Sequence, residues 1–378
     1  MAGSSPEASR TSSQEPGLRL RDLSETDLLA RIVPLFRSAP GVLVGPGDDA
    51  AVVASGHSVV ATTDSMVRGR DWRDDWSSGA DVGRKVVAQN LADVAAMGAV
   101  PTALLVSFAA DPDTEVAWVL DVTGGLAAAA GEAEVAVVGG DLSSAPAGVV
   151  VVSVTALGDL QGRSPVLRSG ARVGDVVAVC GSLGFSGGGL ALYAAGTPVP
   201  PSSPAGGVPA ANNASPAGAG LGEREERDAA VATLMWAHRT AGRPPRRAGV
   251  AAADAGASAL IDVSDGLVRD AGRIAAASGV SVALSGQLLR EGFAAGPLTL
   301  ALGEEEAMRQ VLSGGEEHSL VGCFPRPAWE RLRAAAPAPG EPGWRRIGEV
   351  VSRADGDGVL VTVDGQVPSV TGWDHFAG

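Results

Sequence analysis

Short acidic segments recur along the chain, and each sets an aspartate among small or hydroxyl-bearing residues. They are Gly47-Asp48-Asp49, Thr62-Thr63-Asp64, Asn90-Leu91-Ala92-Asp93, Gly139-Gly140-Asp141 and Asp262-Val263-Ser264-Asp265-Gly266. If the fold brings several of these carboxylates together, they repel one another unless cations lie between them. Oxygen ligands beside small residues suit Mg²⁺, and a substrate phosphate usually completes its shell. The segments therefore predict a magnesium-dependent enzyme that transfers phosphoryl groups from a nucleotide.

Each segment also has an ordinary structural explanation. Glycine and aspartate are common turn residues, which could account for residues 47–49. Residues 62–64 could close a strand, and Asp93 could be an exposed helical residue, although aspartate is a poor helix former. Serine and aspartate are good N-caps, which could account for residues 262–265 before a helix. Residues 139–141 favour a site more strongly, because a strand ending in two glycines leaves backbone N–H groups for a phosphate.

Three other features bear on the kind of site. The run Gly181 to Gly189 lacks the Gly-Lys-Ser/Thr ending of a Walker loop and the dinucleotide-binding spacing, so close packing of a strand on a helix is its better interpretation. Arg168 could clamp a phosphate, or it could be a surface cation. The four histidines are scattered, with no Ser/His/Asp order and no zinc-binding spacing, and they give no support to a hydrolase.

The composition excludes several classes of partner. A net charge of −14 argues against nucleic acid or an anionic membrane as the main partner. No uncharged apolar run is long enough to span a bilayer, and the first residues lack a signal pattern. Cys180 and Cys323 lie in apolar, strand-like runs and are expected to be buried free thiols of a cytoplasmic protein. Lys85 is the only lysine; either arginine cannot replace it, or it was retained by chance.

Apolar periodicity predicts strands that alternate with long helices, and hence a mixed α/β fold. A length of 378 residues suggests two domains. We expect a disordered tail over 1–20, a first domain over 21–165 and a second over 166–378, which a flexible insertion at 196–222 interrupts. Strands are expected at 52–53, 59–62, 103–108, 135–138, 149–156, 175–180, 259–261, 318–324, 347–351 and 359–363. Helices are expected from Ser24 and Leu190 and at 81–97, 115–130, 227–238, 267–278 and 304–312.

Taken in order, the segments resemble the thiamine-monophosphate kinases of the aminoimidazole-ribonucleotide-synthetase-like superfamily. The resemblance runs from about residue 24 to 376, except for the insertion. The matching text is Gly47-Asp48-Asp49-Ala50-Ala51, Thr62-Thr63-Asp64-Ser65, Lys85 through Asn90-Leu91-Ala92-Asp93 to Ala99, Gly139-Gly140-Asp141, Arg168-Ser169-Gly170-Ala171, Ile261-Asp262-Val263-Ser264-Asp265-Gly266-Leu267, Ser313-Gly314-Gly315-Glu316-Glu317 and Trp373-Asp374-His375-Phe376.

The resemblance implies transfer of the γ-phosphate of ATP to thiamine monophosphate, giving thiamine diphosphate and ADP by in-line attack. It implies a two-domain synthetase-like fold and a homodimer, in which the metal- and ATP-binding N-terminal domains join their sheets into a barrel and the C-terminal domains are α/β sandwiches. The implied ligands of several Mg²⁺ ions are Asp49, Thr62, Thr63, Asp64, Asp93, Asp141, Asp262 and Asp265, of which Asp64, Asp141 and Asp265 would be catalytic. The implied ATP contacts are Gly140, Asp141, Arg168 and Ser264, and the implied substrate contacts are Asp71, Glu316 and Trp373.

One departure and two alternatives remain. The family usually carries a His-aromatic pair where this chain reads Arg70-Asp71-Trp72, and Asp71 could still touch the substrate. A sister ATP-dependent synthetase of purine biosynthesis would share the metal carboxylates but lack thiamine recognition. A non-catalytic module that binds divalent cations or nucleotides would bind ATP without turning it over. A selenophosphate synthetase would need a reactive cysteine near the N-terminus, and none precedes Cys180.

Overall fold

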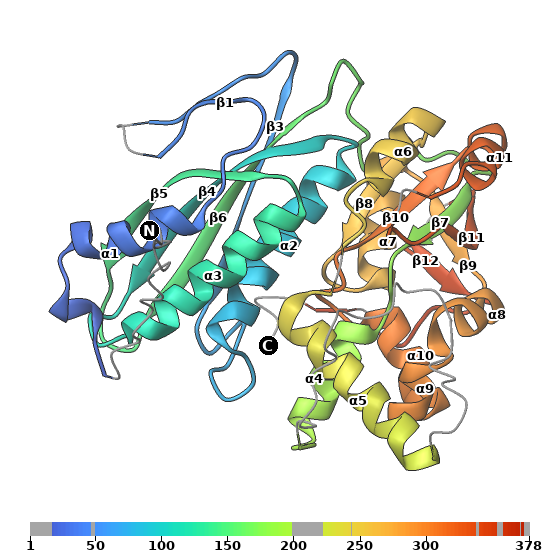
Figure 1. The fold of residues 1–378 in the computed structure, drawn as a ribbon. Helices are drawn as coiled ribbons and strands as arrows, with labels where there is room; N and C mark the ends of the chain where they lie inside the picture. The colour runs from blue at the N-terminus through green and yellow to red at the C-terminus, as the bar shows by residue number, and fades with distance from the viewer. Residues whose placement is uncertain are drawn as a thin grey trace, which may run out of the picture.

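The computed structural model describes residues 17–46, 50–198, 222–242, 244–337, 340–353, 358–370 and 372–373. A four-stranded and a six-stranded sheet with covering helices confirm the predicted mixed α/β fold (Figure 1). Residues 1–16 of the expected tail and 199–221 of the expected insertion lie outside the described residues. Leu20 belongs to the expected tail, yet its N–H donates to the carbonyl oxygen of Thr114 at 3.0 Å.

The four-stranded sheet has the order β3-β6-β4-β5. Its strands are β3 (Val59–Val67), β4 (Val100–Ala110), β5 (Ala136–Ser144) and β6 (Val150–Asp159), and only the β4–β5 pair is parallel. Helices α2 (Gly79–Ala96) and α3 (Val116–Glu132) cover one face (Figure 1). The two helices touch at glycines: a Cβ on Gly83 would lie 2.0 Å from the carbonyl oxygen of Val122. Helix α1 (Glu25–Ile32) begins at Ser24 in a capping box with Asp27, as the sequence predicts.

The described residues cover the other face of this sheet only in part. The hairpin of β1 (Val42–Val44) and β2 (Val52–Val53) packs against one end. Beyond it, hydroxyl groups of neighbouring strands pair on the surface; the Oγ atoms of Ser65 and Ser153 lie 2.6 Å apart. Leu105 keeps 38% of its surface exposed on this face. On the side away from α2, the described part of the chain therefore leaves an uncovered sheet face of mixed polarity.

The six-stranded sheet has the order β12-β9-β11-β7-β10-β8, and only the β12–β9 pair is parallel. Its strands are β7 (Val176–Cys180), β8 (Ala259–Val263), β9 (Ser281–Leu284), β10 (Ser319–Phe324), β11 (Arg345–Val351) and β12 (Val361–Val363). Helices α4 (Phe185–Ala194), α5 (Glu223–Thr240), α7 (Leu267–Ser278), α9 (Pro297–Leu302) and α10 (Glu304–Ser313) cover one face, and α6 (Ala248–Ala255) and α11 (Arg326–Ala334) the other. Short helical turns are η1 (Leu20–Asp22), η2 (Val33–Leu35), α8 (Gly286–Leu289) and the π-turn η3 (Arg290–Ala294).

Three strands run past their predicted ends into the acidic segments. Strand β8 continues to Val263, so Asp262 lies within the strand and not after it. Strand β3 continues to Val67, so residues 62–64 lie in mid-strand. Strand β5 continues to Ser144, because residues 139–144 keep pairing with β4 after a bulge. A Cβ on Gly140 would lie 2.0 Å from the carbonyl oxygen of Val106, so this glycine is needed for close strand contact.

Both cysteines, Cys180 and Cys323, are buried and free, as predicted. Burial raises the pKa of the Cys323 thiol to about 12. Within the described ranges, no helix is both long and apolar enough to cross a membrane.

Candidate active site

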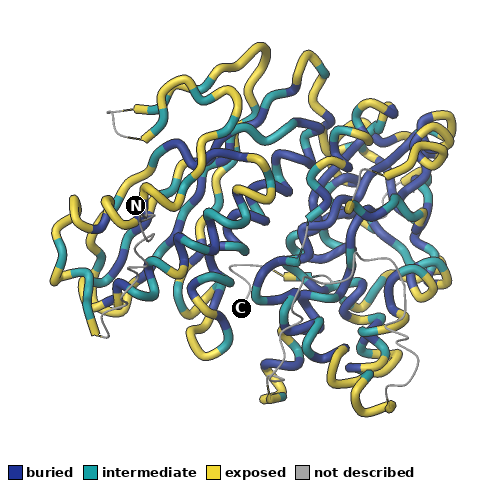
Figure 2. Tube along the Cα trace, in the orientation of Figure 1, coloured by how far each residue is buried: buried dark blue, intermediate teal, exposed yellow. Residues whose placement is uncertain are grey.

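Carboxylates from both sheets meet beside α2. Strand alternation turns Thr62 and Asp64 toward the helix-covered face of the four-stranded sheet, where Met66 of the same row is only 1% exposed. Thr62 Oγ1 donates to Asp93 Oδ2 on α2 at 2.7 Å. Asp262 reaches the same place from β8 of the other sheet, where it is buried. Helix α2, buried along much of its length, lies between the two sheets (Figure 2).

The electrostatics of this cluster are those of crowded anions. Burial, followed by the negative charges of Asp262 and Asp64, raises the pKa of Asp93 to about 7, against the opposing hydrogen bond from Thr62. These effects disfavour the ionised form of Asp93. A cation that binds beside the cluster would stabilise that form. The hydroxyl and carboxylate oxygens are hard donors of the kind that Mg²⁺ takes.

The donor chemistry fits magnesium, but the described side chains do not form a complete shell. Among the described residues, no group of three or more His, Cys, Asp or Glu side chains is arranged to hold a metal ion. Asp49, a further predicted ligand, lies outside the described residues. A magnesium site here would need oxygens from Asp49, a substrate phosphate or a shift of the two sheets.

His318 also belongs to this cluster, and the sequence reasoning missed it. Its Nδ1 lies 3.4 Å from Asp262 Oδ2, and its buried Nε2 has no hydrogen-bond partner among the described residues. Burial lowers the pKa of His318, but the hydrogen bond and charge of Asp262, with help from Glu316 and Asp93, raise it above its ordinary value. The residue directly follows the Ser313–Glu317 motif, and that adjacency is the signal that could have found it.

Asp265 is engaged by arginines of α7. Arg273 Nη2 contacts its Oδ2, and Arg269 Nε lies 3.8 Å from the same atom. The N–H groups of Ser264 and Asp265 both donate to Asp270 Oδ2, at 3.1 and 3.0 Å. Burial, followed by the charge of Asp262, raises the pKa of Asp270 to about 7. The loop donors expected for phosphate oxygens are therefore bonded to a carboxylate here, and the predicted ligand roles of Asp265 and Ser264 stay predictions.

Asp141 lies away from this cluster. It is level with Ser107 on β4 and shares the surface face of the sheet with Ser65 and Ser153, whereas its neighbour Leu142 packs into the core under α2 and α3. Ser143 Oγ donates to Asp141 Oδ2 at 2.8 Å. Asp141 also lies on the opposite edge of the sheet from Asp64. Strands β5 and β3 are three strand spacings apart, which is about 14 Å. One chain therefore does not bring Asp141 together with Asp64 and Asp93.

Two other predicted contacts also lie outside the cluster. Thr63 points to the surface face, where its Oγ1 donates to the carbonyl oxygen of Val154 at 3.1 Å. Arg168 is exposed between β6 and β7, and its carbonyl oxygen accepts from Ser278 Oγ at 3.2 Å. Their roles stay predictions.

Comparison with known proteins shows which family the chain belongs to. Residues 47–160 match the model for the N-terminal domain of AIR synthase related proteins. Over 362 residues the chain is 41% identical to the thiamine-monophosphate kinase of Mycobacterium tuberculosis H37Rv, an alignment that covers 94% of this chain and 93% of that protein. The chain belongs to the thiamine-monophosphate kinase family.

Solved structures of thiamine-monophosphate kinases share the whole fold. The enzyme from Stenotrophomonas maltophilia K279a superposes with a TM-score of 0.72 at 27% identity and covers 91% of this chain and 96% of its own. AaThiL complexed with AMPPCP and TMP superposes with a TM-score of 0.65 at 26% identity, covering 95% and 99% of the two chains. The resemblance drawn from the ordered motifs is thereby confirmed.

The residues that the thiamine-monophosphate kinase resemblance assigns to the substrate lie on three loops. Asp71 Oδ2 accepts from the N–H of Val67 at 2.6 Å and so closes the turn after β3. Glu316 Oε1 lies 2.6 Å from Lys85 Nζ. Trp373 is 52% exposed, and its N–H donates to the carbonyl oxygen of Asp265 at 2.9 Å. The last described residues therefore lie along the α7 side of the carboxylate cluster.

The glycine-rich run from Gly181 to Gly189 allows close packing between elements, which is the interpretation that the sequence favours. Glu317 Oε1 accepts from the N–H of Ser186 at 2.6 Å, so a carboxylate of the protein occupies the start of α4. A Cβ on Gly189 would lie 2.2 Å from the carbonyl oxygen of Leu234, which shows how closely α4 and α5 approach. The glycines are needed for this close approach.

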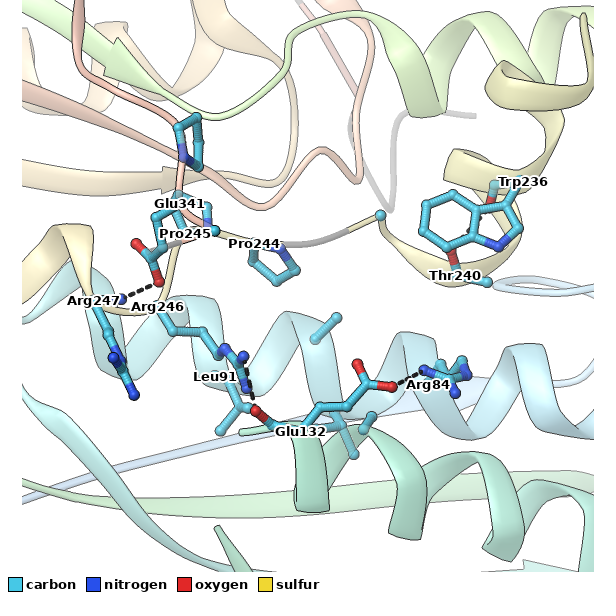
Figure 3. Close-up of a pocket in the computed structure, with 16 residues that line it drawn as sticks. Arg84, Leu91, Glu132, Trp236, Thr240, Pro244, Pro245, Arg246, Arg247 and Glu341 are labelled. Atoms are coloured by element: carbon cyan, nitrogen blue, oxygen red, sulfur yellow. Dashed lines mark hydrogen bonds and ion pairs between the residues drawn. The ribbon is translucent and has the colours of Figure 1, made fainter. Parts of the chain in front are cut away.

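A cavity of about 770 Å³ lies on another side of α2, where α2, α3 and α5 meet residues 244–247 and 340–342 (Figure 3). It contains none of the predicted site residues. Two polar contacts are found in its lining: Arg84 pairs with Glu132 at 3.0 Å, and the backbone N–H of Arg247 donates to Glu341 Oε1 at 2.7 Å. The carboxylate cluster, not this cavity, is the candidate active site.

Proposed function

We propose that this chain phosphorylates thiamine monophosphate to thiamine diphosphate with ATP as the phosphoryl donor. The observation that carries the proposal is the meeting of Thr62, Asp64 and Asp93 with Asp262 of the other sheet, in a chain with full-length thiamine-monophosphate kinase relatives. The buried free thiols fit a cytoplasmic location, which we propose as well.

Phosphoryl transfer to thiamine monophosphate mainly requires that the two substrates are positioned and that their negative charges are neutralised. Magnesium ions held by Thr62, Asp64, Asp93 and Asp262 would neutralise the phosphate oxygens during transfer. The acceptor phosphate oxygen is already anionic, so no strong general base is required. The part of the protein is to hold the two phosphates in line and to keep water out.

A homodimer gives Asp141 a role that one chain does not provide. The uncovered face of the four-stranded sheet carries Asp141, Thr63 and the partly exposed Leu105, and it faces away from α2. We propose that two copies pair through this face, and that Asp141 of one copy completes the site of the other. Mixed polarity of this kind is usual at protein interfaces.

A product assay tests the activity. Purified protein with Mg·ATP and thiamine monophosphate should form thiamine diphosphate and ADP in equal amounts, and neither with EDTA or with unphosphorylated thiamine. Asp93→Asn protein, prepared in parallel, gives the background from contaminating kinases. ATP turnover with another acceptor alone would move the function to a sister synthetase, and nucleotide binding without turnover would leave a binding module.

Complementation tests the shared site. Asp93→Asn and Asp141→Asn chains are each expected to be inactive. Coexpressed, they should recover about a quarter of wild-type activity, because half of randomly paired dimers are mixed and each mixed dimer keeps one intact site. Absence of recovery in dimers verified as mixed would contradict a role for Asp141 across the interface.

A further inference from the structure

The only lysine of the chain lies in the contact between the two sheets. Lys85 is on α2, and its side chain is 2% exposed. Its Nζ lies 2.6 Å from Glu316 Oε1 and 3.4 Å from the carbonyl oxygen of Asp71. The second oxygen, Glu316 Oε2, lies 3.4 Å from Nδ1 of His238 on α5. One buried ammonium group therefore joins a loop of the first sheet to a loop of the second.

The positive charge of Lys85 is balanced by the negative charge of Glu316. Burial raises the pKa of Glu316, but Lys85 and then His238 outweigh that effect, so the pKa of Glu316 is lowered overall. Burial, with the charge of Lys85, lowers the pKa of His238 to about 4, so the imidazole is neutral near pH 7. The Glu316 side chain is 35% exposed, so the pair is buried on the lysine side and open on the other. Removing either partner leaves the remaining charge uncompensated.

The loop that carries Glu316 is tied directly to the carboxylate cluster. Glu316 and His318 have φ angles of +59° and +50°, a conformation that residues with a Cβ rarely adopt unless their surroundings hold it. The N–H of Glu316 donates to Ser264 at 2.6 Å, and the N–H of His318 donates to Val263 at 2.8 Å. The His318 ring in turn contacts Asp262. A movement of Glu316 therefore moves the end of β8.

Helix α2 supplies the other half of the connection. Lys85 and Asp93 are eight residues apart, about 12 Å along the helix. The C-terminal end of α2 is held by close packing, since a Cβ on Gly249 would lie 1.8 Å from the carbonyl oxygen of Ala95. Nearer the N-terminal end, Asp81 pairs with Arg239 of α5 at 3.2 Å, and the Lys85–Glu316 pair is the buried anchor to the 313–318 loop. Asp93 lies between this anchor and the contact of Ala95 with Gly249.

We propose that Lys85 is a positioning residue, whose ion pair with Glu316 holds the 313–318 loop against α2 and so sets the separation between Asp93 and Asp262. The proposal rests on the proposed function of that carboxylate site. It explains why a chain that otherwise uses arginine keeps a lysine here. A compact ammonium group fills the buried space between Glu316 and the Asp71 carbonyl, and the guanidinium fork of arginine is wider.

Kinetics of matched variants test the proposal. The variants are Lys85→Met, Lys85→Arg, Glu316→Gln and the double variant Lys85→Met/Glu316→Gln. The control is Arg84→Met, which removes the neighbouring, more exposed ion pair with Glu132. Lys85→Met and Glu316→Gln should each lower kcat about tenfold and raise the Mg²⁺ concentration for half-maximal activity, and Lys85→Met should change the KM for thiamine monophosphate less than about twofold. The double variant should be no worse than the single ones, and Arg84→Met should behave as wild type.

A binding measurement separates this proposal from the proposed function. Calorimetric binding of a non-hydrolysable ATP analogue, titrated with Mg²⁺, should require more Mg²⁺ in Lys85→Met than in wild type, whether or not thiamine monophosphate is the acceptor. Should Lys85→Met not fold, Lys85→Arg and Glu316→Gln give the same comparison. A Lys85→Met effect confined to the KM for thiamine monophosphate would show that the lysine acts on substrate binding alone, and it would overturn the proposal. So would single-variant losses that multiply in the double variant.

Discussion

Glu317 offers a stability test that does not depend on activity. Its side chain is 5% exposed. Its carboxylate accepts from the N–H groups of Ser186 and Gly187, at 2.6 and 3.4 Å, and from Ser182 Oγ at 3.1 Å. Burial raises its pKa from 4.5 to about 7, against those hydrogen bonds. Glu317→Gln keeps the shape and an oxygen acceptor for Ser186 but removes the titration.

The sign and size of the effect follow from the pKa values. The folded-state pKa lies above the unfolded one, so the folded state binds more protons between pH 4.5 and 7. The free energy of unfolding of wild type therefore falls as the pH rises through this window, and the loss is complete above about pH 7. A shift of about 2.5 units corresponds to about 3 kcal/mol, of which about 2 kcal/mol falls between pH 5.5 and 8. Glu317→Gln does not titrate and lacks this loss.

Urea unfolding followed by tryptophan fluorescence in EDTA measures the effect. The stability of Glu317→Gln relative to wild type should rise by about 2 kcal/mol from pH 5.5 to pH 8. Glu305→Gln, which changes an exposed carboxylate at the start of α10, is the matched control. A wild-type-to-Glu317→Gln difference that stays constant with pH would refute the reasoning, since it would mean that Glu317 is ionised without penalty in the folded protein.

Three further predictions concern packing and the site. Gly83→Ala should lower the unfolding temperature through an overpacking cost of about 1–3 kcal/mol against Val122, whereas Gly131→Ala in α3, with open space around it, should be neutral or stabilising in the same thermal scan. Asp93→Asn should abolish thiamine diphosphate formation in the product assay, and near-wild-type rates would exclude its metal role. Trp373→Ala should raise the KM for thiamine monophosphate more than the KM for ATP, and the reverse order would count against stacking on the substrate.

Much of the fold could be predicted from the sequence. Helix α7, which has a strong apolar stripe, and α2, which is apolar on most sides, appear within about two residues of their predicted ends. Elements with weak signals were not predicted. Strand β9 has four residues, and α6 is largely alanine and glycine, so neither shows a distinct apolar stripe. Both are set by packing against the six-stranded sheet, which no local window contains.

The assembly of the site was less predictable, because strand length decides which face a residue takes. If β5 ended at Val138, Asp141 would lie in a loop at the end of the sheet. Because β5 continues, Asp141 is fixed on the surface face, whereas Asp64 lies on the helix-covered face. The partners of Asp265 were hidden for a different reason. Arg273 lies eight residues further on, and only the turn into α7 brings it back.

Helix α2 shows why a single residue type can carry information that a motif does not. The Asn90–Asp93 motif identifies the carboxylate, but its separation from Asp262 depends on how two sheets are held against one helix. Close glycine and alanine packing holds the C-terminal end of that helix, and small residues of this kind are common in the sequence. Nearer the other end, Lys85 forms a charge pair with Glu316, which is more than two hundred residues away, and one lysine among arginines is its trace in the sequence. The separation of the metal carboxylates is therefore set by contacts outside the acidic motifs, which is why changes at Lys85 should alter magnesium dependence more than substrate affinity.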